Sequence, residues 1–302
     1  MTGARTLGMI LLVVLGWMMR GLTMVLPEVR RGFPTYRAAS GAEPARVAAQ
    51  RVDSRGSGIS YDDVGEGSTI VLISGFSQSG GDWWELGYVD RLVALGRRVL
   101  VVDPLGHGGS DRPHDPESYR WPDVALDIVA TMDAAGVAEA TLWGFSRGAA
   151  LAASAAIELP ARLVGLVLGA GGDLSETPPS ALSPTIETLL AGDWAAFFAT
   201  PAGSIYSDVT RRYHERVNDP RAFGAALAGR RQFPYDLDLG RISAPSFVYG
   251  GSEDEPDRNR CTAQALGVEF HELPGLDHRT GLSATDRVMP VVEPFLQAML
   301  SP

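Results

Sequence analysis

The feature that most constrains the fold is a regular alternation of short apolar runs with longer helix-like stretches, from residue 59 onward. Most of these runs are apolar throughout rather than at every second position, which is typical of parallel strands buried on both faces. The strand-like runs are residues 59–61, 70–73, 99–102, 141–143, 163–168, 247–249 and 268–273. Helix-like stretches at 124–135, at 147–158 and near the C-terminus separate several of them. This alternation predicts an α/β protein with a doubly wound, mostly parallel sheet.

Two stretches depart from the alternation and indicate the domain organisation. Between Gly172 and Arg241 the chain has only helical pieces punctuated by proline, which predicts a helical cap inserted into the sheet domain. Near the start, Gly65-Glu66-Gly67 separates the first two strand-like runs and is typical of a hairpin. We therefore expect three parts: an N-terminal hydrophobic segment and linker (1–50), a core (51–171 and 242–302) and a cap (172–241).

The N-terminal segment contains an apolar stretch. It runs from Leu7 to Met19, which is near the length of a signal-peptide core, and extends to roughly twenty residues only if Arg20 snorkels. More arginines follow the stretch than precede it, so the positive-inside rule would keep the rest of the chain cytoplasmic. We expect a cytoplasmic protein, with membrane association through residues 7–26 left open and export behind a signal peptide as the alternative.

Composition excludes several classes of function. The net charge of −10 argues against a nucleic-acid partner. All 26 cationic residues are arginine, and the absence of lysine excludes Schiff-base chemistry and a lysine-based phosphate loop. The single cysteine, Cys261, cannot form an intrachain disulfide or a cysteine cluster for a metal. We expect it to be a small buried apolar residue.

The clearest chemical motif is the pentapeptide Gly144-Phe145-Ser146-Arg147-Gly148, which follows a short apolar run and opens an Ala-rich helix. A sharp turn from strand to helix needs small residues on both sides of the serine, and it lifts the hydroxyl clear of the sheet. The start of the helix supplies free N–H groups for a developing oxyanion. The pattern predicts that Ser146 is a nucleophile.

Together with further motifs in the same order, this pentapeptide resembles the α/β-hydrolase family, over the chain from Gly56 to the C-terminus. The motifs are Ser74-Gly75-Phe76, in the place of the oxyanion turn, Asp103–Ser110, as a D-x-x-G-x-G-x-S loop, and the two loops 251–254 and 275–278. The resemblance implies a triad of Ser146, Asp254 and His278. It also implies an oxyanion hole made by the backbone N–H groups of Phe76 and Arg147. Ser74 stands where the family has histidine, which keeps the backbone donors but leaves open how the turn is braced.

A serine hydroxyl needs a base within hydrogen-bond reach. Of the five histidines, we assign this role to His278, on a loop after the last strand-like run. The other four receive structural interpretations: His107 supports its glycine-rich turn, His114 and His214 are solvated or locally paired, and His271 lies within a strand.

The acid of the triad has more than one candidate. Asp254 occupies the position that the family pattern implies, but Gly250-Gly251 allows a shift of one residue, which leaves Glu253 as the second candidate. Asp173 is a weaker third. Asp277 is adjacent to His278, and we expect it to cap a helix or to lie on the surface.

These residues predict a cofactor-free serine hydrolase that cleaves a carboxylic ester, like a carboxylesterase, through an acyl-enzyme. Lactones, thioesters and diketones cleaved at a carbon–carbon bond fit the same groups, whereas the resemblance disfavours epoxides, since family members acting on them have aspartate in place of Ser146. A lyase without an acyl-enzyme and a non-catalytic binding protein are the alternatives from other classes. Aromatic residues of the cap line a pocket or form the cap's own core: Trp194, Phe197, Phe198, Tyr206, Tyr213, Phe223, Phe233 and Tyr235. The oligomeric state is not predicted.

Overall fold

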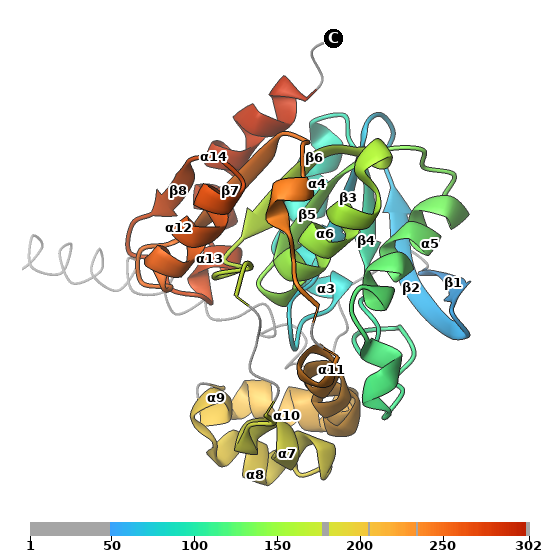
Figure 1. Cartoon of the computed structure of the whole chain (residues 1–302), viewed down its shortest axis with the longest axis vertical. Coiled ribbons are helices and arrows are strands. Elements are labelled where there is room, and N and C mark those ends of the chain that lie inside the picture. The colour runs from blue at the N-terminus through green and yellow to red at the C-terminus, as the bar shows by residue number, and fades with distance from the viewer. Residues whose placement is uncertain (1–48, 177–180, 205, 234, 300–302) are drawn as a thin grey trace, which may run out of the picture. The chain divides into compact units, whose positions relative to one another are not determined.

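A computed structural model describes residues 49–176, 181–204, 206–233 and 235–299. Its eight-stranded sheet has the order β1-β2-β4-β3-β5-β6-β7-β8. The strands are β1 (Gln50–Ser54), β2 (Ser57–Val64), β3 (Thr69–Ile73), β4 (Arg98–Val102), β5 (Ala140–Phe145), β6 (Leu163–Gly169), β7 (Ser246–Gly251) and β8 (Phe270–Leu273). All pairings from β4 to β8 are parallel, whereas β2 is antiparallel to both β1 and β4. The predicted α/β class and mostly parallel sheet are confirmed (Figure 1).

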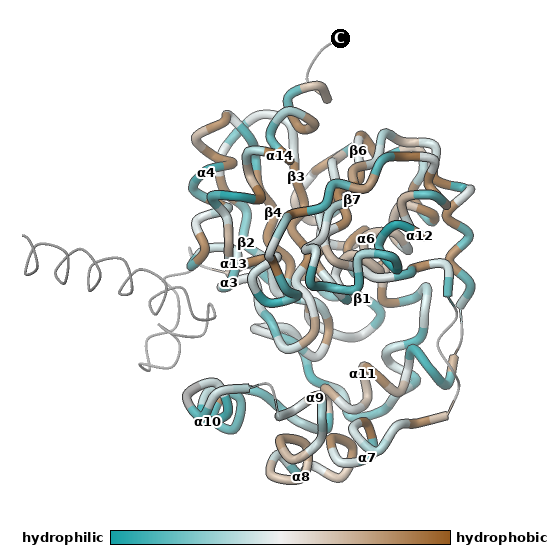
Figure 2. Tube along the Cα trace, turned by 90° about the vertical axis from the view of Figure 1, so that its left-hand side faces the viewer, coloured by the Kyte–Doolittle hydropathy of each residue, from teal (hydrophilic) through white to brown (hydrophobic). Residues whose placement is uncertain are grey.

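Helices cover both faces of this sheet. On one face lie α5 (Leu126–Ala134), α6 (Arg147–Glu158) and α12 (Pro256–Ala265). On the other lie α3 (Gly80–Glu85), α4 (Tyr88–Ala94), α13 (Thr280–Ser283) and α14 (Thr285–Ala298). Successive side chains of β3 enter opposite layers: Val71 and Ile73 pack under α6, and Ile70 and Leu72 under α4. Because both faces are buried, the strands are continuously apolar, and the hydrophobic colour in Figure 2 gathers on β3 and β4.

The predicted hairpin between the first two strand-like runs is wrong. The hairpin joins β1 to β2 through Arg55-Gly56, and β4 lies between β2 and β3. Gly65 and Gly67 serve a close approach instead. A Cβ atom at Gly65 would lie 2.4 Å from the backbone oxygen of Arg97, and one at Gly67 would lie 2.3 Å from that of Gly96. Both oxygens belong to the turn before β4. The end of the predicted linker, Gln50, belongs to β1.

In the described part of the chain between β6 and β7, five α-helices follow one another: α7 (Pro184–Leu190), α8 (Trp194–Ala199), α9 (Pro201–Ser204), α10 (Asp208–Val217) and α11 (Pro220–Gln232). The described part of this stretch contains no strand, and its helices lie together beyond one end of the strands (Figure 1). Side chains of Ser183, Asp193, Ser207 and Asp219 accept hydrogen bonds from the first turns of α7, α8, α10 and α11. We call these five helices the cap.

Most of the aromatic residues of the cap form a core of their own. Leu189, Phe197, Phe198 and Phe223 are buried together, with Trp194 and Tyr206 packed against them. One ring of the sheet domain, Phe76, joins this cluster. Elsewhere, the ring of Phe233 lies under the guanidinium of Arg120, and the Tyr235 hydroxyl donates to Glu158.

The interpretation of Cys261 as a buried residue is wrong, because its side chain is exposed on α12. This helix buries Asn259, Thr262 and Ala263, so Cys261 lies on its outer side. The apolar stretch at residues 7–26 lies outside the described residues. Within the described ranges, no helix combines the length and apolarity needed to cross a membrane.

Trp143 offers a test of the core. It is fully buried in β5, and its ring centroid lies 5.7 Å from that of Trp83 and 5.5 Å from that of Tyr88. Trp143→Ala removes these contacts and leaves a cavity, so we expect it to lower the free energy of unfolding by about 3–5 kcal/mol in denaturant titrations. Leu126→Ala, at an exposed position, is the control and should change it by no more than about 0.5 kcal/mol. Equal losses in both variants would contradict this account of the core.

Candidate active site

Ser146 lies in a tight turn between β5 and α6, with φ 55° and ψ −122°. The two flanking glycines make the turn sterically possible. A Cβ atom at Gly144 would lie 2.1 Å from the carbonyl oxygen of Gly148, and one at Gly148 would lie 2.2 Å from that of Ile73. A positive φ at a residue other than glycine is strained and is found mainly at functional sites. The turn therefore presents the serine at the carboxyl ends of the parallel strands, where such sheets place their ligands.

The structure brings His278 and Asp254 to this serine. His278 Nε2 lies 2.9 Å from Ser146 Oγ, and His278 Nδ1 lies 2.9 Å and 3.0 Å from the two carboxylate oxygens of Asp254. The His278 side chain is half exposed, whereas that of Asp254 is only 12% exposed. The three groups thus form a continuous chain of hydrogen-bond contacts that ends on the serine oxygen.

The other candidate acids lie elsewhere. Glu253 contributes a backbone N–H to the Leu276 carbonyl, and no contact joins its side chain to His278. Asp173 accepts from the hydroxyl and N–H of Ser175. Asp277 accepts from the N–H and hydroxyl of Thr280, so it caps the turn that leads into α13. Geometry therefore favours Asp254 among the four.

Backbone contacts hold the acid loop against the histidine loop. Glu253 N–H donates to Leu276 O over 3.0 Å, and Ser252 N–H donates to Leu273 O over 3.0 Å. The approach requires Gly251, since a Cβ atom there would lie 1.9 Å from Leu276 O. Asn259, which the sequence did not single out, donates to the Asp254 carbonyl over 3.0 Å and so fixes the loop to α12.

The turn that carries Phe76 lies against Ser146. A Cβ atom at Gly75 would be 3.3 Å from Ser146 Cβ. The backbone N–H of Gly75 donates to Gln78 Oε1 over 2.9 Å, so Gln78, rather than the residue at position 74, braces the turn. Ser74 is buried, and its hydroxyl has no hydrogen-bond partner among the described residues.

The cap provides a second brace for this turn. The Phe76 ring packs on Phe223 of α11 at a centroid distance of 5.0 Å. Ser77 has φ 62°, and its hydroxyl lies 2.9 Å from that of Tyr206. These roles of Gln78 and Tyr206 could not be predicted from the sequence, because nothing in the local pattern relates them to residues 75–77.

The remaining histidines have structural surroundings. His107 is fully buried and stacked on Phe223 at 4.6 Å, and burial lowers its pKa to about 3. His114 pairs with Asp219, with 2.7 Å between Nε2 and Oδ2, and His271 stacks on Phe247 at 4.1 Å. For His214, the solvated interpretation is wrong and the locally paired one is right: it is buried in the cap, 2.7 Å from the Asn218 amide nitrogen.

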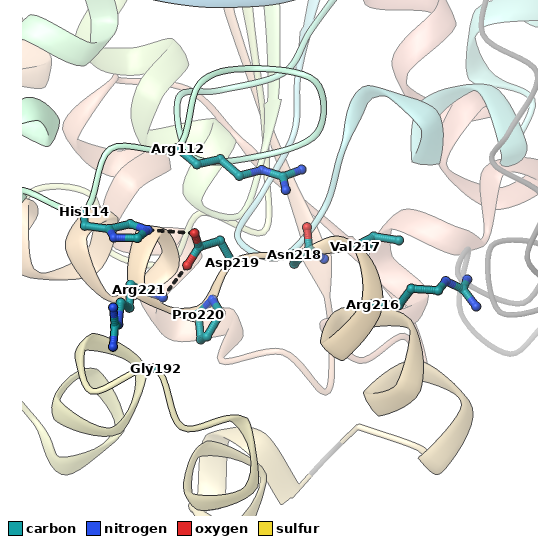
Figure 3. A pocket seen from close by; sticks show the side chains of 9 residues that line it. All are labelled: Arg112, His114, Gly192, Arg216, Val217, Asn218, Asp219, Pro220 and Arg221. Atoms are coloured by element: carbon teal, nitrogen blue, oxygen red, sulfur yellow. Dashed lines mark hydrogen bonds and ion pairs between the residues drawn. The ribbon is translucent and has the colours of Figure 1, made fainter.

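Two hollows lie near these groups. A cavity of about 210 Å³ is lined by Ser146, Arg147, Asp254 and His278 together with residues 170–172 and Arg258. A larger, more open hollow of about 470 Å³ lies between the loop at residues 112–114 and the junction of α10 with α11 (Figure 3). The His114–Asp219 pair joins loop and cap at its edge. The smaller cavity is lined by Ser146 and is the candidate substrate site.

Known proteins are similar to this chain in fold and in sequence. Residues 68–218, half of the chain, match the alpha/beta hydrolase fold family, so the chain belongs to this family. It is 28% identical over 234 residues (70% of this chain, 85% of the relative) to RutD of Variovorax paradoxus, which is provisionally named a carbamate hydrolase. It is 35% identical over 108 residues (35% of this chain, 37% of the relative) to the 2-hydroxymuconate semialdehyde hydrolase of a Pseudomonas species. A solved N-acyl homoserine lactone degrading enzyme is similar with a TM-score of 0.66 at 25% identity, covering 82% of this chain and 100% of that enzyme.

Burial of His214 has a consequence for acid stability. Burial lowers the pKa of His214 to about 4, below the value of about 6.5 in an unfolded chain. The unfolded state therefore takes up a proton first, so the free energy of unfolding decreases as the pH falls from about 6.5 to 4. At pH 4 this one group lowers the free energy of unfolding by on the order of 3 kcal/mol.

Denaturant titrations of the wild type and of His214→Gln at pH 8 and pH 4 measure this effect. At pH 8 the free energy of unfolding of the variant should differ from that of the wild type only by the cost of the lost Asn218 contact. Between pH 8 and pH 4 this difference should shift by about 3 kcal/mol in favour of the variant, because only the wild type has the buried imidazole. Parallel pH profiles for the two proteins would contradict the buried neutral state of His214.

Proposed function

We propose that the protein is a serine hydrolase that cleaves an ester or lactone through a covalent acyl-enzyme on Ser146. The observation that carries the proposal is the continuous contact from Asp254 through His278 to Ser146, each step of about 2.9 Å. Three side chains from separate loops meet in the order and geometry that nucleophilic catalysis by serine requires.

In the first half of the reaction, His278 Nε2 takes the proton from Ser146 Oγ as this oxygen attacks the substrate carbonyl carbon. Asp254 accepts a hydrogen bond from Nδ1–H, which holds the imidazole in the correct tautomer and stabilises its cation. The carbonyl oxygen becomes an oxyanion, which the backbone N–H groups of Phe76 and Arg147 receive. The alcohol then leaves with the proton from His278, and the acyl group stays on Ser146.

In the second half, a water molecule replaces the alcohol. His278 takes a proton from the water as its oxygen attacks the acyl carbon, and the same two N–H groups receive the second oxyanion. Collapse of this intermediate releases a carboxylic acid, and His278 returns the proton to Ser146. In a lactone the alcohol and the acyl group belong to one molecule, so a single hydroxy acid is released.

Similarity to known proteins supports this substrate class and one alternative. The N-acyl homoserine lactone degrading enzyme, at 25% identity, favours an ester or lactone. The stretch at 35% identity to 2-hydroxymuconate semialdehyde hydrolase favours hydrolysis of a carbon–carbon bond as the second candidate. A panel of nitrophenyl esters, lactones and a vinylogous diketone separates the two.

Replacing the nucleophile tests the proposal directly. Ser146→Ala should lower kcat for a nitrophenyl ester by about 10⁴ or more and abolish labelling by a fluorophosphonate, because no acyl-enzyme can form. Ser154→Ala is the matched control, as this serine lies on α6 but is buried without a hydrogen-bond partner among the described residues. Turnover that persists without any trapped ester on Ser146 would instead favour a lyase, and a wild type without turnover a binding protein.

The choice of acid yields a separate prediction. Asp254→Asn should lower kcat by about 10⁴, because the amide cannot stabilise the imidazolium and favours the wrong tautomer. Glu253→Gln, one residue away, should leave kcat within a few-fold of the wild type, since its side chain makes no contact with His278. Circular dichroism checks that both variants are folded. A large loss in Glu253→Gln with little change in Asp254→Asn would reverse the assignment.

A further inference from the structure

The side chain of Arg147, the residue after Ser146, carries a charge that the proposed reaction does not use. Arg147 is the first residue of α6 and lines the smaller cavity with Ser146 and His278. Its guanidinium makes no hydrogen bond or ion pair with any described residue, and its Nη1 atom is fully enclosed by protein. A second arginine of the cavity, Arg258, is paired with Glu176 at 2.8 Å and with Glu255 at 3.3 Å. Arg147 therefore differs from Arg258, which has two carboxylate partners.

The surroundings of Arg147 do not neutralise its charge. Among the described residues, Tyr119, Arg230 and Asp127 act on it electrostatically. The carboxylate of Asp127 already accepts from Ser54 at 2.6 Å and from Arg55 at 3.0 and 3.1 Å. Arg230 adds a second positive charge nearby; its guanidinium stacks on Trp121 at 4.5 Å. Burial lowers the pKa of Arg147 to about 10, so the group is still charged at neutral pH.

Another polar atom in this region also has no partner. His107 Nε2 is buried without a hydrogen bond among the described residues, and Arg147 is one of the charges that act on His107. A buried charge without a counterion is strongly destabilising, so such a group is retained at a binding site for what it binds. The planar guanidinium presents paired donors that match the two oxygens of a carboxylate.

We propose that Arg147 binds a carboxylate carried by the substrate, so that the enzyme acts on esters or lactones with a second, anionic group. The inference rests on the proposed function and names the substrate class of that site. Because Arg147 directly follows Ser146 in the chain, the substrates chosen to test the proposal carry the carboxylate a few bonds from the reacting carbonyl. The net charge of −10 does not attract anions over long distances, so recognition depends on this local contact.

Paired substrates of equal chain length measure this preference. The 4-nitrophenyl monoesters of glutarate and adipate are compared with 4-nitrophenyl pentanoate and hexanoate, after correction for uncatalysed hydrolysis. We expect the wild type to favour the anionic ester in kcat/KM by about tenfold or more, since hydrogen bonds between charged groups are the stronger ones. Arg147→Met should reduce the ratio of the two kcat/KM values to about one or below, and Arg147→Lys should restore part of it. The ratio is independent of any effect that the substitution has on the chemistry of both esters.

Arg258→Met is the matched control, because it removes the other arginine of the same cavity. It should keep the wild-type ratio. Thermal unfolding of Arg147→Met provides a second readout: replacing a buried unpaired charge by an apolar side chain should preserve or raise Tm. A lower Tm in Arg147→Met, or a ratio that responds to Arg258 and not to Arg147, would overturn the proposal.

Binding of glutarate, measured by calorimetry, separates this proposal from the hydrolase assignment. Glutarate should bind the wild type and Ser146→Ala, and its affinity should fall by about tenfold or more in Arg147→Met. If no ester is turned over but glutarate binding still depends on Arg147, the proposed function fails and the anion site stands. Equal glutarate affinity in the wild type and Arg147→Met overturns the anion site, whatever the esterase activity.

Discussion

The strained turn at Ser146 is the constraint on which the site depends. A left-handed backbone at a residue with a side chain costs roughly 1–3 kcal/mol and persists only where the surroundings hold it. Here Ser146 N–H donates to Gly169 O over 2.8 Å, and its carbonyl accepts from Ala149 N–H over 2.9 Å. The turn is thus fixed to β6 on one side and to α6 on the other. Because β5 is buried on both faces, this turn cannot relax without disturbing the core.

His278 and Asp254 are brought to Ser146 in a different way. The loops after β7 and β8 are joined by backbone hydrogen bonds, and Gly251 lets them approach to a distance that no other residue allows. The carboxylate is therefore nearly buried, whereas the imidazole stays half exposed. This difference in exposure suits the proton transfers proposed for His278, since Asp254 is shielded while the imidazole is accessible.

The cap also contacts the turn that carries Phe76. Phe223 contacts both the turn that carries Phe76 and the buried His107, and Tyr206 meets Ser77. The position of the cap is thereby linked to that of the turn, which lies against Ser146. Gln78 holds the turn from within, so the serine at position 74 needs no bracing role. In this way the cap and the sheet domain together define the surroundings of Ser146.

Features of the fold and site that depend on a few neighbouring residues could be predicted from the sequence, whereas contacts between distant segments could not. Apolar runs such as 70–73 and 99–102 identify buried strands, and the pentapeptide around Ser146 identifies the turn, because each signal is complete within a few residues. Strand pairing is not local: Gly65 and Gly67 indicated a hairpin, yet their contacts are with the turn before β4. The exposure of Cys261 and the burial of His214 likewise depend on which side of a helix meets a neighbour.

The sequence alone determined the fold class and the chemical groups, since periodicity and residue type are properties of the chain itself. Only the tertiary structure decided which acid meets His278, which residues brace the turn at Phe76, and that the charge of Arg147 has no counterion. These are distances between segments far apart along the chain, from Asp254 to His278 or from Asp127 to Arg147, and packing sets such distances.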